Sequence, residues 1–156
     1  MKSMFAGALA VIALTSPAAA VETIGYGSRA GMEVTVTSKS GIGGQNAVIR
    51  AVHTRENAKK FCIEYAQDSS EKCVRDELAV SLSNHITANC KTGVFTTFYG
   101  AKLKFAGLNK QTDQDFAKYR IVDLADGKAL DGSEASGYPY DIEQFIALCP
   151  GLATSE

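Results

Sequence analysis

Residues 32–52 carry two β-type patterns separated by a glycine-rich stretch. Residues 32–38, MEVTVTS, alternate apolar and polar side chains and are rich in β-branched residues. Residues 47–52, AVIRAV, are again mostly apolar and β-branched. Both patterns are typical of strands. The intervening SGIGGQN predicts a turn, so two neighbouring strands joined by a tight connection are expected in this region.

A helical pattern follows these strands. Thr54 is a suitable N-cap, and the apolar residues after it recur at the i, i+3, i+4, i+7 spacing of one helix face. That face consists of Ala58, Phe61, Cys62 and Tyr65. We expect a helix over this stretch and a second short helix over residues 71–78.

Short β-type segments fill the middle of the chain, separated by Gly, Asn or Asp. They read LAVSL, HITANC, VFTTFYG, KLKFAG and YRIVDL. Asp-Gly steps at Asp126 and Asp131 suit tight turns.

A last helix is predicted near the carboxy terminus. Asp141 is placed as its N-cap, with Gln144 at the third helical position. Its apolar stripe consists of Ile142, Phe145, Ile146 and Cys149. Together the elements predict an α+β fold: a small antiparallel sheet or partial barrel with two or three short helices, stapled by two disulfides.

The first twenty residues have the composition of a signal peptide. Lys2 supplies a positive start, residues 4–14 form an apolar run, and Ala18 and Ala20 give the small-x-small cleavage pattern. The run is too short to span a bilayer, and no cysteine stands next to the predicted cleavage point for lipid attachment. We expect cleavage after Ala20, a periplasmic location without a membrane anchor, and a single mature domain over residues 21–156.

Four cysteines in an exported chain predict two disulfides rather than free thiols. Three pairings are open. Cys62–Cys73 with Cys90–Cys149 is favoured, because the first pair closes a short local loop and the second ties the carboxy-terminal segment to the middle of the chain. Metal binding is the weaker use, since no two cysteines stand in C-x-x-C spacing and the chain has only two histidines.

Charge is distributed unevenly along the chain. Residues 91–120 hold six basic residues and two acidic ones, whereas residues 123–143 hold six acidic residues and one lysine. The acidic block suits either an ordinary solvated surface or a face for a cationic partner.

Known catalytic patterns fit the sequence poorly. SSEK at residues 69–72 and KTG at residues 91–93 match two elements of penicillin-recognising enzymes, but the middle Ser-x-Asn element is missing. Cys90 with His85 or His53 would need a free thiolate, which export disfavours. No acid is flanked as a buried catalytic carboxyl would be.

The sequence offers nothing for a nucleic-acid role, since the chain has no Trp, no aromatic-plus-basic stripe and a slightly negative net charge. We therefore expect a binding protein rather than an enzyme, without a cofactor, metal site or nucleic-acid partner.

The segments GMEVTVTSKSGI, FCIEYAQDSSEKC, DGSEASGY and LCPG together resemble a group of small exported, disulfide-containing proteins of alphaproteobacteria. That resemblance covers almost the whole mature chain and concerns fold and location.

A second resemblance is confined to residues 133–140, SEASGYPY. They are similar to the Ser-Gly-rich loop with which bacterial periplasmic lysozyme inhibitors plug the muramidase cleft. In that interpretation Ser133 and Ser136 supply hydroxyls, Gly137 permits close backbone approach, and Tyr138 fills a sugar subsite. The alternative is a strand-to-helix connection with local hydrogen bonds.

The leading hypothesis is thus a periplasmic, non-catalytic inhibitor of lysozyme or of an endogenous muramidase. An envelope structural or ligand-binding protein is the alternative, followed by a small cell-wall hydrolase.

Overall fold

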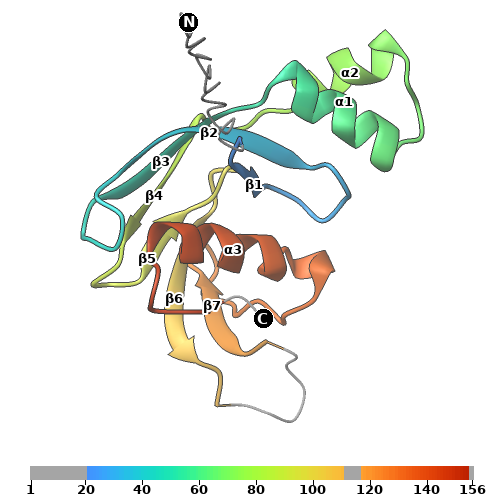
Figure 1. Cartoon of the computed structure of the whole chain (residues 1–156). Coiled ribbons are helices and arrows are strands. Elements are labelled where there is room, and N and C mark those ends of the chain that lie inside the picture. Colours follow the sequence, from blue (N-terminus) through green and yellow to red (C-terminus); the bar gives the residue numbers. More distant parts are fainter. Residues whose placement is uncertain (1–20, 111–116, 155–156) are drawn as a thin grey trace, which may run out of the picture.

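Seven strands form one antiparallel sheet in the order in which they occur along the chain (Figure 1). The computed structural model describes residues 21–110 and 117–154, so the expected leader lies outside the described residues. The sheet curves into a half-barrel, which confirms the predicted α+β class and antiparallel sheet. The strands are β1 (Thr23–Gly25), β2 (Glu33–Ser40), β3 (Ala47–Val52), β4 (His85–Asn89), β5 (Val94–Thr96), β6 (Lys102–Leu108) and β7 (Tyr119–Asp123).

Helix α3 (Tyr138–Leu148) covers the inner face of the sheet and closes the main core. Phe145 is fully buried, with its ring centroid 4.5 Å from that of Phe105 and 5.1 Å from that of Phe95. Burial of one such side chain contributes roughly 1.5–3 kcal/mol. The predicted stripe of α3 therefore faces the sheet.

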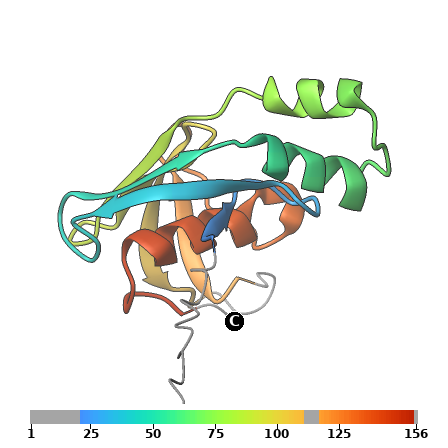
Figure 2. The same cartoon turned by 45° about the horizontal axis from the view of Figure 1, so that its top comes forward.

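Helices α1 (Arg55–Glu64) and α2 (Glu71–Leu78) form a pair at one end of the sheet (Figures 1 and 2). Thr54 caps α1 as predicted, accepting a hydrogen bond from the N–H of Asn57 at 3.1 Å. The pair has a small core of its own around Phe61 and Val74. Within the described residues, no helix is long and apolar enough to cross a membrane.

The predicted disulfides Cys62–Cys73 and Cys90–Cys149 are both present. The first joins α1 to α2, and the second joins the end of β4 to the end of α3. Each bond therefore holds two separate elements of the fold together.

Several predicted elements differ in the structure. LAVSL is not a strand, because it begins in the last turn of α2 and continues as the connection to β4. VFTTFYG is a strand only as far as Thr96 and then turns. The short strand β1 was not predicted, and the N-cap of α3 is Gly137 rather than Asp141.

Candidate functional site

Three connections meet around a hollow of about 510 Å³. They are the turn after β1, the turn between β5 and β6, and the segment that leads from the short 3₁₀ helix η1 (Glu134–Ser136) into α3. We call this hollow the tyrosine groove. Its main side chains are Arg29, Tyr99, Ser136, Tyr140 and Asp141, together with Tyr26, which is only 2% exposed.

Gly137 forms the sharp corner between η1 and α3. Its φ of 80° lies in the left-handed region, which glycine adopts without steric cost. Pro139 at the second helical position then suits the start of α3. Helix α3 thus begins three residues before the predicted cap, and Asp141 lies inside its first turn.

The two serines of the predicted inhibitory loop are occupied within the loop. Ser133 Oγ donates to Asp131 Oδ1 at 2.6 Å and accepts from the N–H of Ser136 at 3.3 Å. Ser136 Oγ donates to the carbonyl oxygen of Ser133 at 2.7 Å. Only Ser136 and Gly137 of the four predicted site residues line the groove with an accessible surface.

Tyr138 lies in the core and not in the groove. Only 8% of its surface is exposed, and its hydroxyl accepts a hydrogen bond from the Tyr119 N–H at 3.1 Å. It is the first residue of α3 and lies on the same buried stripe as Phe145, seven positions later. In this structure the ring of Tyr138 is therefore not exposed to a sugar subsite.

Tyr99 is an exposed aromatic residue that the sequence patterns did not single out. It stands at the turn between β5 and β6 and is 55% exposed, whereas its neighbours Thr97 and Phe98 are buried. The N–H of Gly100 donates to the carbonyl oxygen of Thr97 at 2.9 Å and closes the turn. The Tyr-Gly step in the sequence could have indicated this exposed position, because glycine after Tyr99 favours a turn rather than a continuing strand.

Gln144 fixes two walls of the groove relative to each other. Its buried amide accepts from the N–H of Phe98 at 3.1 Å and donates to the carbonyl oxygen of Gly25 at 3.1 Å. These bonds tie the turn that carries Tyr99 and the end of β1 to α3. The groove is therefore a preorganised surface, which lowers the entropic cost of binding.

Asp141 is the electrostatically unusual residue of the groove. Burial raises the pKa of its carboxyl to about 7, and the negative charge of Asp123 acts in the same direction. The start of a helix favours the charged form, but burial dominates. Near neutral pH this side chain can both donate and accept hydrogen bonds, a property that the residues flanking Asp141 in the sequence did not indicate.

Asp141→Asn is expected to stabilise the protein at pH 8. The pKa of this carboxyl in the folded protein, about 7, is higher than its ordinary value in the unfolded chain. Its contribution to the stability of the fold is therefore complete at low pH and is lost as the pH rises to 7. We expect a gain of about 2 kcal/mol at pH 8, discounted for residual solvent contact, and almost none at pH 4. Urea unfolding at both pH values measures the difference.

Asp126→Asn is the matched control for this measurement. A hydrogen bond from the backbone N–H of Lys128 lowers the pKa of the exposed Asp126, so its replacement is not expected to stabilise the protein at pH 8. Equal effects of Asp141→Asn at pH 4 and pH 8 would contradict the assignment.

A buried polar cluster of Tyr26, Glu77 and His53 lies directly behind the Tyr26 wall of the groove. The side chains of His53 and Glu77 retain only 9% and 8% of their exposure, and the Tyr26 hydroxyl donates to Glu77 Oε1. His53 Nε2 lies 4.0 Å from that oxygen, and neither ring nitrogen has a hydrogen-bond partner among the described residues. Nothing in the sequence around His53 or Glu77 indicates that either side chain is buried.

This Tyr26–Glu77–His53 cluster is not shaped as a metal site. Neighbouring ligands of a tetrahedral zinc ion, each about 2.1 Å from the metal, lie about 3.4 Å apart, closer than His53 and Glu77. The residues that the structure describes contain no group of three or more His, Cys, Asp or Glu side chains arranged to hold a metal ion.

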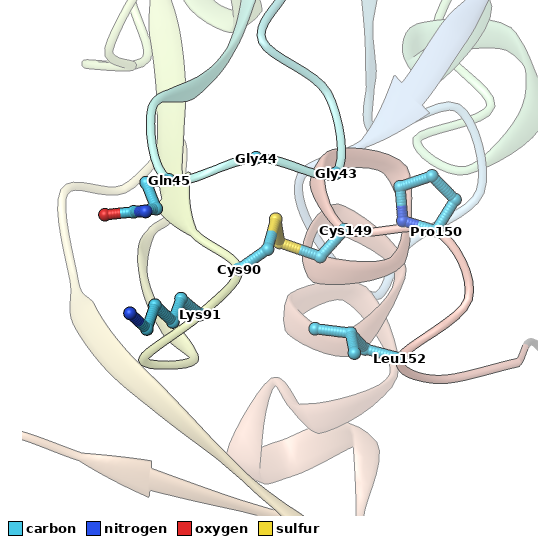
Figure 3. A pocket seen from close by; sticks show the side chains of 8 residues that line it. All are labelled: Gly43, Gly44, Gln45, Cys90, Lys91, Cys149, Pro150 and Leu152. Atoms are coloured by element: carbon cyan, nitrogen blue, oxygen red, sulfur yellow. A yellow bond between two sulfur atoms is a disulfide. The ribbon is translucent and has the colours of Figure 1, made fainter.

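A second hollow, of about 390 Å³, surrounds the Cys90–Cys149 disulfide (Figure 3). The turn of Gly43 and Gly44 lies over the bond, with Lys91 and Leu152 at the sides. Its backbone groups are already used: Cys90 N–H donates to Gly44 at 3.0 Å and Gly43 N–H donates to Leu148 at 2.9 Å. We therefore interpret this hollow as a structural joint between β4, α3 and the turn after β2.

Comparison with models of known protein families, with curated proteins and with solved structures found no match. The groove itself is therefore the basis on which a function can be assigned.

Proposed function

We propose that this chain is a non-catalytic binding protein of the bacterial envelope and that the tyrosine groove binds the amino-sugar chain of peptidoglycan. The observation that carries the proposal is the placement of Tyr99 and Tyr140 beside the Asp141 carboxyl in one preorganised hollow. This is the ligand-binding alternative that the sequence left open, with the groove in place of the Ser133–Tyr138 loop.

The chemistry of the groove suits a sugar chain. Tyrosine rings offer flat apolar faces for the C–H faces of pyranose rings and a hydroxyl for their polar edges. The Asp141 carboxyl can donate and accept hydrogen bonds, and the Arg29 guanidinium donates them. The volume of about 510 Å³ lies within the usual range of ligand sites, which supports a short stretch of glycan as occupant.

The arrangement favours binding over hydrolysis. A glycosidase needs two carboxyls on opposite sides of the scissile bond, one of them held as an acid. Asp141 has the raised pKa of an acid, but Glu134, the other carboxylate of the groove, is exposed on η1. Glu134 therefore lacks the environment that tunes a catalytic partner.

Inhibition of a lysozyme-type muramidase is the second candidate. The observation that favours it is the exposed pair Glu134 and Ala135 at η1, held rigidly beside Ser136 and Gly137. A preformed acidic turn suits the cleft of a cationic enzyme. In this version Tyr138 anchors the turn from inside and does not enter the cleft.

Tyr99→Ala is expected to weaken binding to purified peptidoglycan by roughly tenfold, since one ring face is lost from the site. Cosedimentation of the disulfide-bonded protein with sacculi measures the affinity. Leu108→Ala is the matched control, because Leu108 is also exposed, at 65%, but lies at the opposite end of β6 from the groove. Equal binding by the wild type and the Tyr99 variant would remove the groove from consideration.

Muramidase digestion of labelled wall separates the two candidates. If the protein coats the glycan, it slows digestion, and added unlabelled wall relieves the effect. If the protein binds the enzyme, added wall has no such effect, and Glu134→Lys relieves the inhibition instead. The glycan proposal predicts the first pattern.

A further inference from the structure

The Tyr26–Glu77–His53 cluster joins three parts of the molecule. Tyr26 follows β1, His53 precedes α1, and Glu77 belongs to α2. The ring of Tyr26 contacts His53 edge-on on one side, at 5.4 Å between centroids, and Tyr99 on the other, at 5.9 Å. Tyr26 is only 2% exposed and borders the tyrosine groove through its contact with Tyr99, so a movement of Tyr26 would alter the groove wall.

In the structure the Tyr26 hydroxyl is held by Glu77, while His53 has no hydrogen-bond partner within the described chain. A neutral imidazole at 4.0 Å does not compete for the carboxylate. A protonated imidazole would, because a charge-assisted hydrogen bond to a carboxylate is roughly twice as strong as a neutral one and forms near 2.8 Å. A shift of about 1 Å is enough to bring Nε2 to Glu77.

We propose that this cluster is a proton-operated control of the tyrosine groove: protonated His53 takes Glu77 as its partner, and the released Tyr26 changes the groove wall. The inference rests on the proposed function in that it concerns the regulation of the same groove. No covalent step is involved, and the proton comes from solvent.

The groups around His53 are consistent with this control. Glu77 from α2 and Tyr26 after β1 face it directly, with Tyr99 and Arg29 beyond Tyr26. Burial lowers the pKa of His53 below its usual value, and the charge of Glu77 opposes that effect, so the neutral imidazole is favoured at pH 7.5. Glu77 also adds to the raised pKa of Tyr99, which burial mainly causes, so its field reaches the groove.

The chain is well suited to a direct test, since it contains only two histidines. His85 is exposed on β4 and serves as the internal control. NMR spectra of the ligand-free protein between pH 7.5 and 5 follow both imidazoles and the backbone amides of Tyr26, Arg29 and Tyr99. The titration is run in the Asp141→Asn background, so that the carboxyl inside the groove does not contribute.

We expect the three groove amides to shift with the titration curve of His53 and not with that of His85. His53→Gln and, separately, Glu77→Gln should abolish the shift, whereas His85→Gln should preserve it. With Asp141 intact, peptidoglycan affinity should change about fivefold or more over the same pH range in a His53-dependent way.

The proposal would be overturned if the chemical shifts of the groove amides did not follow the titration of His53. It would also be overturned if His53 stayed neutral until the protein unfolded in acid. The wild-type titration decides this even if a variant fails to fold. The pH-dependent chemical shifts are measured without ligand. If they are observed but the protein does not bind glycan, the proposed function is refuted and the proton-operated control of the groove still holds.

Discussion

Tyr138→Ala is expected to lower the free energy of unfolding by about 4 kcal/mol rather than to remove a binding contact. Truncating a buried aromatic side chain typically costs 3–5 kcal/mol, and the ring of Tyr138 is 8% exposed within the main core. The change also leaves the N–H of Tyr119 without its acceptor. Since a domain of this size is commonly stable by only 5–15 kcal/mol, the loss is a large fraction of the total.

Urea unfolding of the disulfide-bonded protein measures this effect, and two variants frame it. Tyr138→Phe keeps the ring but removes the acceptor for Tyr119, so a cost of about 1–2 kcal/mol is expected. Tyr99→Ala, at an exposed turn, should cost less than about 1 kcal/mol. If Tyr138→Ala were as stable as the wild type, the ring would have to lie in solvent, as an inhibitory role for this side chain requires.

Removing the Cys90–Cys149 disulfide by a double alanine substitution is expected to cost about 4 kcal/mol. The bond spans 59 residues, and a loop of that length loses about 4 kcal/mol of unfolded-chain entropy on cross-linking. It also holds the end of α3, whose packing forms the core, against the end of β4 and the Gly43–Gly44 turn. Thermal and urea unfolding of the variant test the value.

The Cys62–Cys73 disulfide serves as a comparison for the Cys90–Cys149 disulfide within the same chain. Its span is 11 residues, which corresponds to about 3 kcal/mol. Its loss should loosen the small α1–α2 core before the sheet, because Phe61 and Val74 pack separately from the main cluster. A larger effect from the short-span bond than from the long-span bond would contradict this ranking.

Much of the fold follows from local patterns in the sequence. Alternation predicts β2 and the β-branched run predicts β3, the Thr54 cap and apolar spacing predict α1, and cysteine spacing predicts both disulfide pairs. These features depend on neighbours in the chain, so the sequence carries them directly. The three-residue strand β1 is different. It is too short to show an alternation of apolar and polar residues, and only its pairing with β2 identifies it as a strand.

The candidate site was harder to predict because tertiary placement decides it. Tyr138 and Tyr140 stand two positions apart, yet the start of α3 at Gly137 sends one ring into the core and the other toward the groove. The observed N-cap, Gly137, lies four residues before the expected cap, Asp141, so the helix predicted from the sequence excludes both tyrosines. Likewise, Glu77 lies in a charged run of the sequence, and only the packing of α2 beside Tyr26 shows that it is buried.

Glycan binding in the tyrosine groove is tested at residue level by an NMR titration of the disulfide-bonded protein with soluble glycan fragments of peptidoglycan. We expect saturable shifts at Arg29, Tyr99, Gly100 and Gly137, which belong to the three segments around the groove. Shifts confined to the outer face of the sheet, around Thr87 and Thr96, or no shifts at millimolar fragment, would contradict glycan binding by the groove.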